Sequence, residues 1–256
     1  MTTPRTIFIT GAGGGLGRGL GLIFAAQGHT ILATDLRVDA ARETAEQIRR
    51  AGGTAEAFAL DVSSARDVQR LWGELGGRRI DVLINNAGLQ HISSVEEFPE
   101  EKWDLLMDVI VKGTFLVTRA ALPGMRAQGF GRLIHIGSIH SLIASPYKSA
   151  YSAAKHALLG FSKSLALETG GTDITSNTIC PSYIRTPLVE GQIKDQARTR
   201  QISESDVVEK VMLAPMPKKA FVTIEELGAA IGYLMSPLAR NVTGQTITID
   251  GGWTAQ

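Results

Sequence analysis

The fold class is indicated most directly by one segment near the N-terminus, Thr6-Ile7-Phe8-Ile9-Thr10-Gly11-Ala12-Gly13-Gly14-Gly15-Leu16-Gly17. An apolar run rich in β-branched residues leads directly into a glycine-rich turn, and residues 16–27 then show the helical spacing of apolar side chains. A strand, a tight turn and a helix in this order form the first half of a parallel βαβ unit. Glycines in such a turn permit positive φ angles and a close approach of the backbone to another group.

The same alternation continues along the chain. The expected strands are Thr6–Thr10, Thr30–Thr34, Ala55–Leu60, Asp81–Asn85, Arg132–Ile136, Ile174–Ile179 and Thr246–Ile249. The expected helices are 16–27, 39–51, 64–76, 100–127, 150–168 and 223–235. Apolar strands joined by helical crossovers imply a parallel sheet that is covered on both faces. We therefore expect an α/β fold with one doubly wound, seven-stranded sheet, whose ligands bind at the carboxyl ends of the strands.

One segment, at about 186–219, interrupts this alternation before the last helix. It is polar, helical in places, and ends in Ala214-Pro215-Met216-Pro217. An insertion of this length is usually a lid, a binding loop or a disordered excursion, and we favour a lid. Because no linker rich in Pro, Gly or Ser divides the chain, we expect residues 1–256 to form a single domain.

The composition narrows the classes of partner. The 256 residues are 44% hydrophobic, and 26 basic residues against 25 acidic ones give a formal net charge of +1. Without a basic patch, nucleic acid and anionic membranes are not expected partners. The single cysteine, Cys180, excludes an intramolecular disulfide and a cysteine-built zinc site, and we expect no metal. The N-terminal residues lack signal-peptide character and no run is long enough to span a membrane, so we expect a cytoplasmic protein.

The glycine-rich turn is suited to a dinucleotide. A pyrophosphate can lie on the N-terminus of the helix that follows such a turn, although a tight turn without a ligand would look similar. Asp35 ends the second strand, where its carboxylate can accept hydrogen bonds from ribose hydroxyls and repel a 2′-phosphate. We therefore expect NAD rather than NADP, with the reservation that Arg37 could neutralise a phosphate. The alternative for Asp35 is a solvated turn residue.

Two further strands end in polar residues. Asp61 follows the third strand, and Asn85-Asn86-Ala87-Gly88 closes the fourth. Since parallel strands end at one edge of a sheet, these residues would line the same crevice. Turn chemistry is the alternative for the two asparagines, because Asn readily adopts left-handed conformations.

Ser138, Tyr151 and Lys155 are the candidate catalytic residues. Ser138 follows the fifth strand, and Tyr151 and Lys155 lie at i and i+4 on the next helix, which places a phenol and an ammonium on one face. A nearby ammonium and the positive ring of an oxidised nicotinamide would both favour the phenolate, so we expect a lowered pKa for Tyr151. Ser138 would orient a reacting oxygen while Tyr151 exchanges its proton and a hydride moves to or from carbon. A Tyr-x-x-x-Lys pair on an exposed amphipathic helix is common, and this is the alternative.

Together these motifs resemble the short-chain dehydrogenase/reductase family over the whole chain. The matching residues are Thr10-Gly11-x-x-x-Gly15-x-Gly17, Asn85-Asn86-Ala87-Gly88, Ser138 and Tyr151-x-x-x-Lys155. The resemblance implies a Rossmann-type sheet, a nicotinamide cofactor and a homotetramer. It also implies cofactor contacts from Gly11, Gly15, Leu16, Gly17, Asp35, Asp61, Val62, Asn86, Ala87, Gly88, Tyr151, Lys155, Pro181 and Thr186.

Two positions depart from the family pattern. Ile110 stands where the family commonly has an asparagine that helps to hold a water beside the lysine, largely through its backbone carbonyl. Ser182 stands where a glycine usually follows the proline, and would crowd the approach to the nicotinamide slightly. The first departure leaves open a dinucleotide-binding sensor with weakened turnover.

Three donors converge on the catalytic tyrosine. Gln90, His140 and Lys148 offer an amide, an imidazole and an ammonium, which together suit a small anion such as a carboxylate. Each residue alone has an ordinary alternative: a capping amide, a neutral turn histidine and a solvated lysine. Trp253 forms either part of the core or an apolar wall of the pocket, and Tyr183 another wall, while Gln192 could reach the anion from the lid.

Within the family, the substrate segments resemble those of the bacterial D-3-hydroxybutyrate dehydrogenases. The matching segments include Gly88-Leu89-Gln90-His91, Lys148-Ser149-Ala150-Tyr151, Arg185-Thr186-Pro187-Leu188-Val189-Glu190 and Asp250-Gly251-Gly252-Trp253-Thr254. The resemblance implies a substrate site of Gln90, Ser138, His140, Lys148, Tyr151, Tyr183, Gln192 and Trp253. It implies NAD-dependent interconversion of (R)-3-hydroxybutyrate and acetoacetate, as in ketone body metabolism. Tyr183 replaces the usual tryptophan, which leaves room for another small hydroxy acid, a sulfonate or a polyol.

Overall fold

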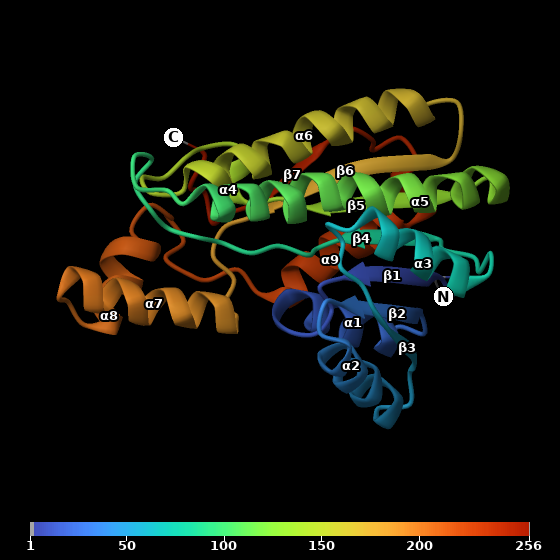
Figure 1. The fold of residues 1–256 in the computed structure, drawn as a ribbon, viewed down its shortest axis with the longest axis horizontal. Coiled ribbons are helices and arrows are strands. Elements are labelled where there is room, and N and C mark those ends of the chain that lie inside the picture. Colours follow the sequence, from blue (N-terminus) through green and yellow to red (C-terminus); the bar gives the residue numbers. More distant parts are fainter. Residues whose placement is uncertain (1–2, 256) are drawn as a thin grey trace.

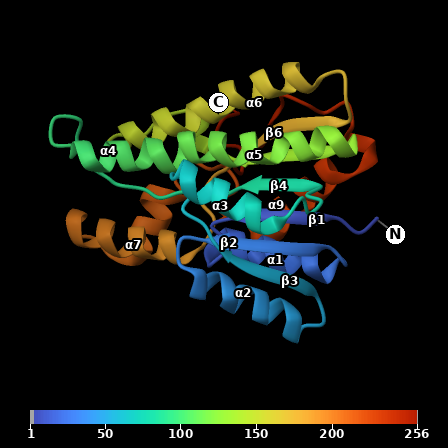
Figure 2. The same ribbon diagram turned by 45° about the vertical axis from the view of Figure 1, so that its right-hand side comes forward.

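A seven-stranded parallel sheet forms the centre of the molecule, with strand order β3-β2-β1-β4-β5-β6-β7 (Figures 1 and 2). The computed structural model describes residues 3–255, apart from the side chains of Pro187, Leu188, Asp195 and Thr199. The strands are β1 Thr6–Thr10, β2 Thr30–Asp35, β3 Thr54–Ala59, β4 Val82–Asn85, β5 Gly131–Ile136, β6 Ile174–Pro181 and β7 Thr246–Ile249. The strand order reverses between β1 and β4, which is where doubly wound sheets bind ligands.

Helices cover both faces of the sheet. They are α1 Gly15–Ala26, α2 Val38–Arg50, α3 Ala65–Leu75, α4 Glu100–Leu106, α5 Gly113–Gln128, α6 Ser149–Thr169, α7 Pro187–Arg200, α8 Glu204–Asp206 and α9 Ile224–Met235. Side chains alternate along the strands: Ile7 and Ile9 pack with α1, α2 and α9, whereas Phe8 packs with α3, α5 and α6. The two resulting cores make the sheet buried on both faces, as the sequence predicts.

The long helix expected at 100–127 is interrupted. A π-helical segment, Met107–Lys112, separates α4 from α5. Ile110 lies in this segment, is 1% exposed, and packs with Ala154 and Leu158 of α6. A π-helical segment adds only one residue to a helical turn, and this hardly changes the spacing of apolar residues along the helix. The sequence pattern therefore did not reveal the interruption.

The insertion at 186–219 is mostly helical. It contains α7, α8 and a second π-helical segment, Val207–Met212. Val189, Ile193, Val207 and Met212 form a small separate core of this region. In both views α7 lies beyond the carboxyl ends of the strands (Figures 1 and 2). No helix in residues 3–255 is both long enough and apolar enough to cross a membrane.

Candidate functional site

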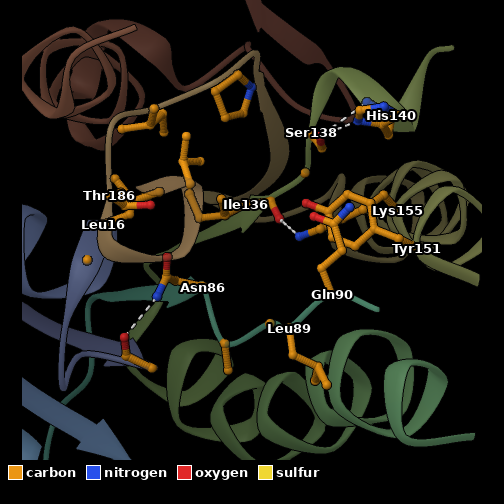
Figure 3. A pocket seen from close by; sticks show the side chains of 18 of the residues that line it. Leu16, Asn86, Leu89, Gln90, Ile136, Ser138, His140, Tyr151, Lys155 and Thr186 are labelled. Atoms are coloured by element: carbon orange, nitrogen blue, oxygen red, sulfur yellow. Dashed lines mark hydrogen bonds between the residues drawn. The ribbon is translucent and has the colours of Figure 1, made fainter. Parts of the chain in front are cut away.

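A cavity of about 450 Å³ opens at the carboxyl ends of the central strands. Figure 3 shows Leu16, Asn86 and Thr186 on one side of it, and Ser138, His140, Tyr151 and Lys155 on the other. The predicted residues that line it are Gly11, Gly15, Leu16, Asp35, Asn86, Ala87, Gly88, Gln90, Ser138, His140, Lys148, Tyr151, Lys155, Pro181, Tyr183, Thr186 and Gln192. Residues far apart in the sequence thus share one chamber that spans the predicted cofactor and substrate sites.

Four predicted residues are not among those that line the cavity. Gly17 acts through packing, since a Cβ there would lie 2.3 Å from the carbonyl oxygen of Gly11. The Asp61 carboxylate accepts hydrogen bonds from the backbone and hydroxyl of Ser63, and Val62 packs against Gly113. Trp253 packs against Tyr183, with ring centroids 5.9 Å apart and the rings tilted by 32°.

The glycine turn leaves the start of α1 open to the cavity. Gly11 and Gly15 have φ angles of 65° and 50°, which are the left-handed values that favour glycine. Gly14 precedes α1 without a side-chain cap, and a Cβ there would meet nothing within 4 Å. The start of α1 therefore lines the cavity without a capping side chain, which suits a pyrophosphate.

Thr10 and Asn86 fix this turn to the loop after β4. The Asn86 amide donates to the carbonyl oxygens of Thr10 and Gly11 at 2.8 and 3.1 Å. The Thr10 hydroxyl in turn accepts from the backbone N–H groups of Asn86 and Ala87, each at 3.0 Å. The structure therefore gives the Asn86 amide a positioning role.

Asp35 lines the cavity at the end of β2. Its carboxylate accepts from the backbone N–H of Gly13 at 2.9 Å and from that of Arg37 at 3.0 Å. Arg18 is held by Glu43 at 2.9 Å and by the Gly13 carbonyl at 2.7 Å. Arg37 also lines the cavity and is exposed, so a carboxylate and a guanidinium both face this end.

Ser138, Tyr151 and Lys155 lie together at the other end of the chamber (Figure 3). Ser138 stands between β5 and the short helix Ile139–Ser141, where its hydroxyl accepts from the backbone N–H of His140 at 3.1 Å. Lys155 is 4% exposed and donates to the carbonyl oxygen of Ile136 at 2.6 Å. Its ammonium lies 5.6 Å from the centroid of the Tyr151 ring.

The Lys155 ammonium alone does not lower the pKa of Tyr151. Burial raises the pKa of Tyr151 to about 12, and this effect outweighs its hydrogen bond with Ser138. Burial also lowers the pKa of Lys155 to about 8. Desolvation thus disfavours both charged forms, so the phenol is neutral at pH 7 and suited to donate a proton.

A second lysine faces the substrate end. Lys148 is 7% exposed, and burial lowers the pKa of its ammonium to about 8. It donates to the Tyr183 hydroxyl at 3.4 Å, and no carboxylate forms an ion pair with it among the side chains that the structure describes. A buried cation without an acid partner is costly, and an anionic ligand would relieve that cost.

Neutral polar side chains line the same cavity as this cation. Burial, together with the charge of Lys148, lowers the pKa of His140 to about 3 and keeps the ring neutral. The His140 ring lies 2.8 Å from the Ser145 hydroxyl and 3.4 Å from that of Ser138. Gln192 of α7 donates to the Gln90 side-chain oxygen at 3.0 Å and so ties the insertion to the loop after β4.

Some lining residues were not in the predicted site. They are Gly14, Arg37, Leu89, Ile136, Gly137, Ile139, Ser182, Ile184 and Val189. Most of them are neighbours of predicted residues in the sequence. Their position near the carboxyl end of a strand was therefore the signal that could have identified them. Among the described residues no cluster of three or more His, Cys, Asp or Glu suits a metal.

Comparisons with known proteins agree with this geometry. A family model described as Enoyl-(Acyl carrier protein) reductase matches residues 11–254. The chain is 39% identical to D-beta-hydroxybutyrate dehydrogenase of Rhizobium meliloti (strain 1021), over 98% of this chain and 99% of that protein. It is also 39% identical to D-beta-hydroxybutyrate dehydrogenase of Cupriavidus necator, over the full length of both.

A solved structure shares the fold at TM-score 0.88 and 31% identity, over 98% of this chain and 97% of the other. It is described as an NAD(P)-dependent gluconate 5-dehydrogenase from Beutenbergia cavernae, with NADP bound at low occupancy. The chain is similar over its full length to these oxidoreductases. Its structure has a doubly wound sheet, a glycine turn open to a cavity, and a serine, a tyrosine and a lysine at the far end of that cavity. The chain therefore belongs to the short-chain dehydrogenase/reductase family and is an oxidoreductase.

Proposed function

We propose that the protein interconverts (R)-3-hydroxybutyrate and acetoacetate with NAD as the cofactor. The observation that carries this proposal is Lys148, a buried ammonium without an acid partner among the described side chains, in the same cavity as Tyr151. A carboxylate on the substrate would supply the missing charge. The relatives named D-beta-hydroxybutyrate dehydrogenase support the same substrate.

In this proposal Tyr151 moves the proton at the reacting oxygen. Its phenol donates to the ketone oxygen during reduction and takes the proton of the alcohol during oxidation. The Ser138 hydroxyl binds that oxygen. Lys155, which is fixed by its hydrogen bond to the Ile136 carbonyl oxygen, lies beside the Tyr151 ring. A nicotinamide dinucleotide bound here would supply the hydride chemistry at carbon 3, and its oxidised ring would add a positive charge that favours the Tyr151 phenolate.

The remaining predicted residues position the two ligands. Lys148, Gln90 and His140 hold the carboxylate, Gln192 assists from α7, and Tyr183 forms a wall backed by Trp253. The open start of α1 and the glycine turn fit a pyrophosphate, and Asp35 fits ribose hydroxyls. Residues 186–219 act as the lid that excludes water in this single-domain protein.

NAD is proposed over NADP because the Asp35 carboxylate would repel a 2′-phosphate while Arg18 is paired with Glu43. The kcat/KM for NAD should exceed that for NADP by at least about 10-fold, and Asp35→Ala should reduce this ratio because Arg37 remains. Equal kcat/KM values for NAD and NADP in the unmodified enzyme would contradict the cofactor assignment.

The test of the activity is NADH fluorescence with (R)-3-hydroxybutyrate and with its (S) enantiomer. We expect NADH formation with the (R) acid and little with the (S) acid, since carboxylate, carbinol and Tyr151 must meet in one orientation. Acetoacetate with NADH should give the reverse reaction. Absence of turnover with both acids and with acetoacetate would refute the proposal.

Another small anionic or polyol alcohol is the second candidate, favoured by the similarity to the protein described as a gluconate 5-dehydrogenase. A panel of hydroxy acids, sulfonates and sugars compared by kcat/KM would identify it. A dinucleotide-binding sensor is the candidate that Ile110 favours, and NADH formation with any of these alcohols would exclude it.

We also propose, from the family resemblance, a homotetramer located in the cytoplasm and serving ketone body metabolism. Exposed apolar side chains on α4 and α5, Trp103, Leu105 and Phe115, support contact between subunits. Light scattering coupled to size-exclusion chromatography would test the tetramer, and a mass of one chain, 27.4 kDa, would contradict it.

A further inference from the structure

Tyr183 lines the cavity together with Lys148, and its hydroxyl lies next to the lysine ammonium. Lys148 Nζ donates to the Tyr183 hydroxyl oxygen at 3.4 Å and lies 5.4 Å from the centroid of the ring. The ammonium is therefore closer to the hydroxyl than to the face of the ring. The sequence pattern suggests only a wall of the pocket at position 183, whereas the structure places a polar atom there beside the cation.

The proton of the Tyr183 hydroxyl has no acceptor within the described part of the protein. The hydroxyl oxygen accepts from Lys148, and no carbonyl, carboxylate or hydroxyl among the described residues accepts from Tyr183 in return. Burial raises the pKa of Tyr183, so the hydroxyl keeps this proton at pH 7. A phenol that accepts from a cation is also a better donor, because linked hydrogen bonds polarise one another. Tyr183 is thus a neutral donor available to a ligand.

The Lys148 ammonium also keeps donors for a ligand. An ammonium has three N–H groups, and Lys148 uses one of them for the Tyr183 hydroxyl. No described carboxylate forms an ion pair with Lys148. The two residues therefore offer two neighbouring donor atoms, one charged and one neutral. A carboxylate has two oxygens and can accept from two neighbouring donors at once.

The Tyr183 side chain is held in place by its neighbours. Trp253 packs against the ring, and the small apolar core of the insertion at 186–219 also contacts it. The Tyr183 backbone carbonyl accepts from the Val222 N–H at 2.9 Å, which fixes the start of the segment after β6. A ligand that binds to the hydroxyl would therefore cost this side chain little conformational freedom.

We propose that Tyr183 is a substrate-binding residue whose hydroxyl accepts from Lys148 and donates to the substrate carboxylate, so that the two residues bind one carboxylate together. This inference rests on the proposed function, because it assigns a second contact to the anion that the same site takes. Lys148 is the N-cap of α6, and Tyr151 lies three positions further on, so the carboxylate is held near the hydroxyl that transfers the proton. A substrate without an acceptor for both donors would leave one of them unpaired, and this selects for acids.

The test uses Tyr183→Phe, which removes the hydroxyl and keeps the ring. The dissociation constant of butyrate, measured by isothermal titration calorimetry on the enzyme with NAD bound, should rise by about 10-fold, because the carboxylate loses a hydrogen bond. Tyr183→Phe should also lower kcat/KM for (R)-3-hydroxybutyrate about 10-fold more than kcat/KM for the neutral alcohol 2-butanol. The loss with the acid should appear mainly as a higher KM.

Tyr147→Phe is the matched control. Tyr147 directly precedes Lys148 but is 60% exposed and does not line the cavity, so butyrate should bind to this variant as it does to the unmodified enzyme. A double variant tests whether the two donors act together. In Lys148→Met, the further change Tyr183→Phe should weaken butyrate binding by less than about 3-fold, because the phenol has already lost the cation that polarises it.

The outcomes separate this inference from the proposed function. An unchanged dissociation constant of butyrate in Tyr183→Phe, or no binding of butyrate to the unmodified enzyme, would overturn the inference whatever alcohol is oxidised. Equal losses of kcat/KM with the acid and with 2-butanol would also overturn it, since they indicate a disturbed pocket. Weaker butyrate binding in Tyr183→Phe, combined with no turnover of (R)-3-hydroxybutyrate or acetoacetate by the unmodified enzyme, would support the anion contact and refute the proposed reaction.

Discussion

At the scale of single residues, Lys148 distinguishes this site most clearly. Burial lowers the pKa of Lys148 to about 8. Its hydrogen bond to the Tyr183 hydroxyl, at 3.4 Å, only partly offsets the cost of burying the charge. The cost of keeping it charged is recovered when a carboxylate binds. In the proposed function, Lys148 therefore favours a substrate that carries a negative charge.

Tyr151→Phe removes the hydroxyl that moves the proton in the proposed mechanism, while it leaves the ring in place. We expect kcat to fall by about 10²- to 10⁴-fold, which is the usual contribution of general acid–base catalysis. Binding of NADH, followed by fluorescence titration, should persist. A kcat within threefold of the unmodified enzyme would remove Tyr151 from the mechanism.

The charge of Lys148 predicts how anion binding depends on pH. Its pKa in the folded protein is about 8, below the ordinary 10.5, so the ammonium is lost as the pH rises through about 8. The inhibition constant of butyrate, which lacks the reacting hydroxyl, should therefore rise by about 10-fold per pH unit above about 8. In Lys148→Arg the guanidinium stays charged, so this rise should shrink. A constant value to pH 9.5 in the unmodified enzyme would contradict the role of Lys148.

The sequence predicts which residues gather in the chamber better than it predicts their contacts. Strand ends meet at one edge of a parallel sheet, and this brought Asp35, Asn86 and Ser138 into the predicted site. The bond between Gln90 and Gln192 joins residues 102 positions apart and depends on how α7 lies, which no local pattern encodes. The pKa of Tyr151 likewise depends on burial by several segments.

At the scale of elements, the π-helical segment Met107–Lys112 is the largest departure from the expected pattern. The strands were predicted within two residues at each end, because short continuous apolar runs bounded by turn residues mark strands that are buried on both faces. The π-helical segment places Ile110 against Ala154 and beside Tyr151 in one small apolar cluster. At position 110, where the family commonly has an asparagine, this segment therefore contacts α6 through apolar packing.

Ile110→Asn should destabilise the protein more than it changes catalysis. A buried amide would replace an apolar side chain that is 1% exposed, at a cost of about 2–3 kcal/mol. Because Lys155 is already held by the Ile136 carbonyl, kcat should change by less than about 3-fold. Ile110→Val, which should cost about 1 kcal/mol, is the control for packing alone. The prediction is tested by measuring thermal unfolding and kcat of both variants. A 10-fold gain in kcat for Ile110→Asn would contradict it and show that the missing amide limits turnover.

At the scale of the whole molecule, the buried charge of Lys148 should reduce stability. Below pH 8 the folded protein must keep Lys148 charged in a buried position, whereas the unfolded chain keeps the ordinary pKa of 10.5. The difference corresponds to a cost of ~3 kcal/mol that disappears as the pH rises from about 8 to 10.5.

Lys148→Met should therefore raise the free energy of unfolding by about 1–3 kcal/mol at pH 7, since a buried charge is replaced by an apolar chain of similar length. For a chain of this size the Tm should rise by several degrees. The gain should be smaller at pH 9.5, where the unmodified lysine is mostly neutral. A Tm that falls at pH 7 would mean that the lysine is paired in solution.

The most direct measurement compares kcat/KM for (R)-3-hydroxybutyrate and for the neutral alcohol 2-butanol, in the unmodified enzyme and in Lys148→Met. Loss of a charge-assisted contact should lower kcat/KM for the acid by about 10- to 100-fold more than for the alcohol. The loss should appear mainly as a higher KM for the acid. Equal effects on the acid and the alcohol would contradict an anion-selecting lysine beside a proton-transferring tyrosine.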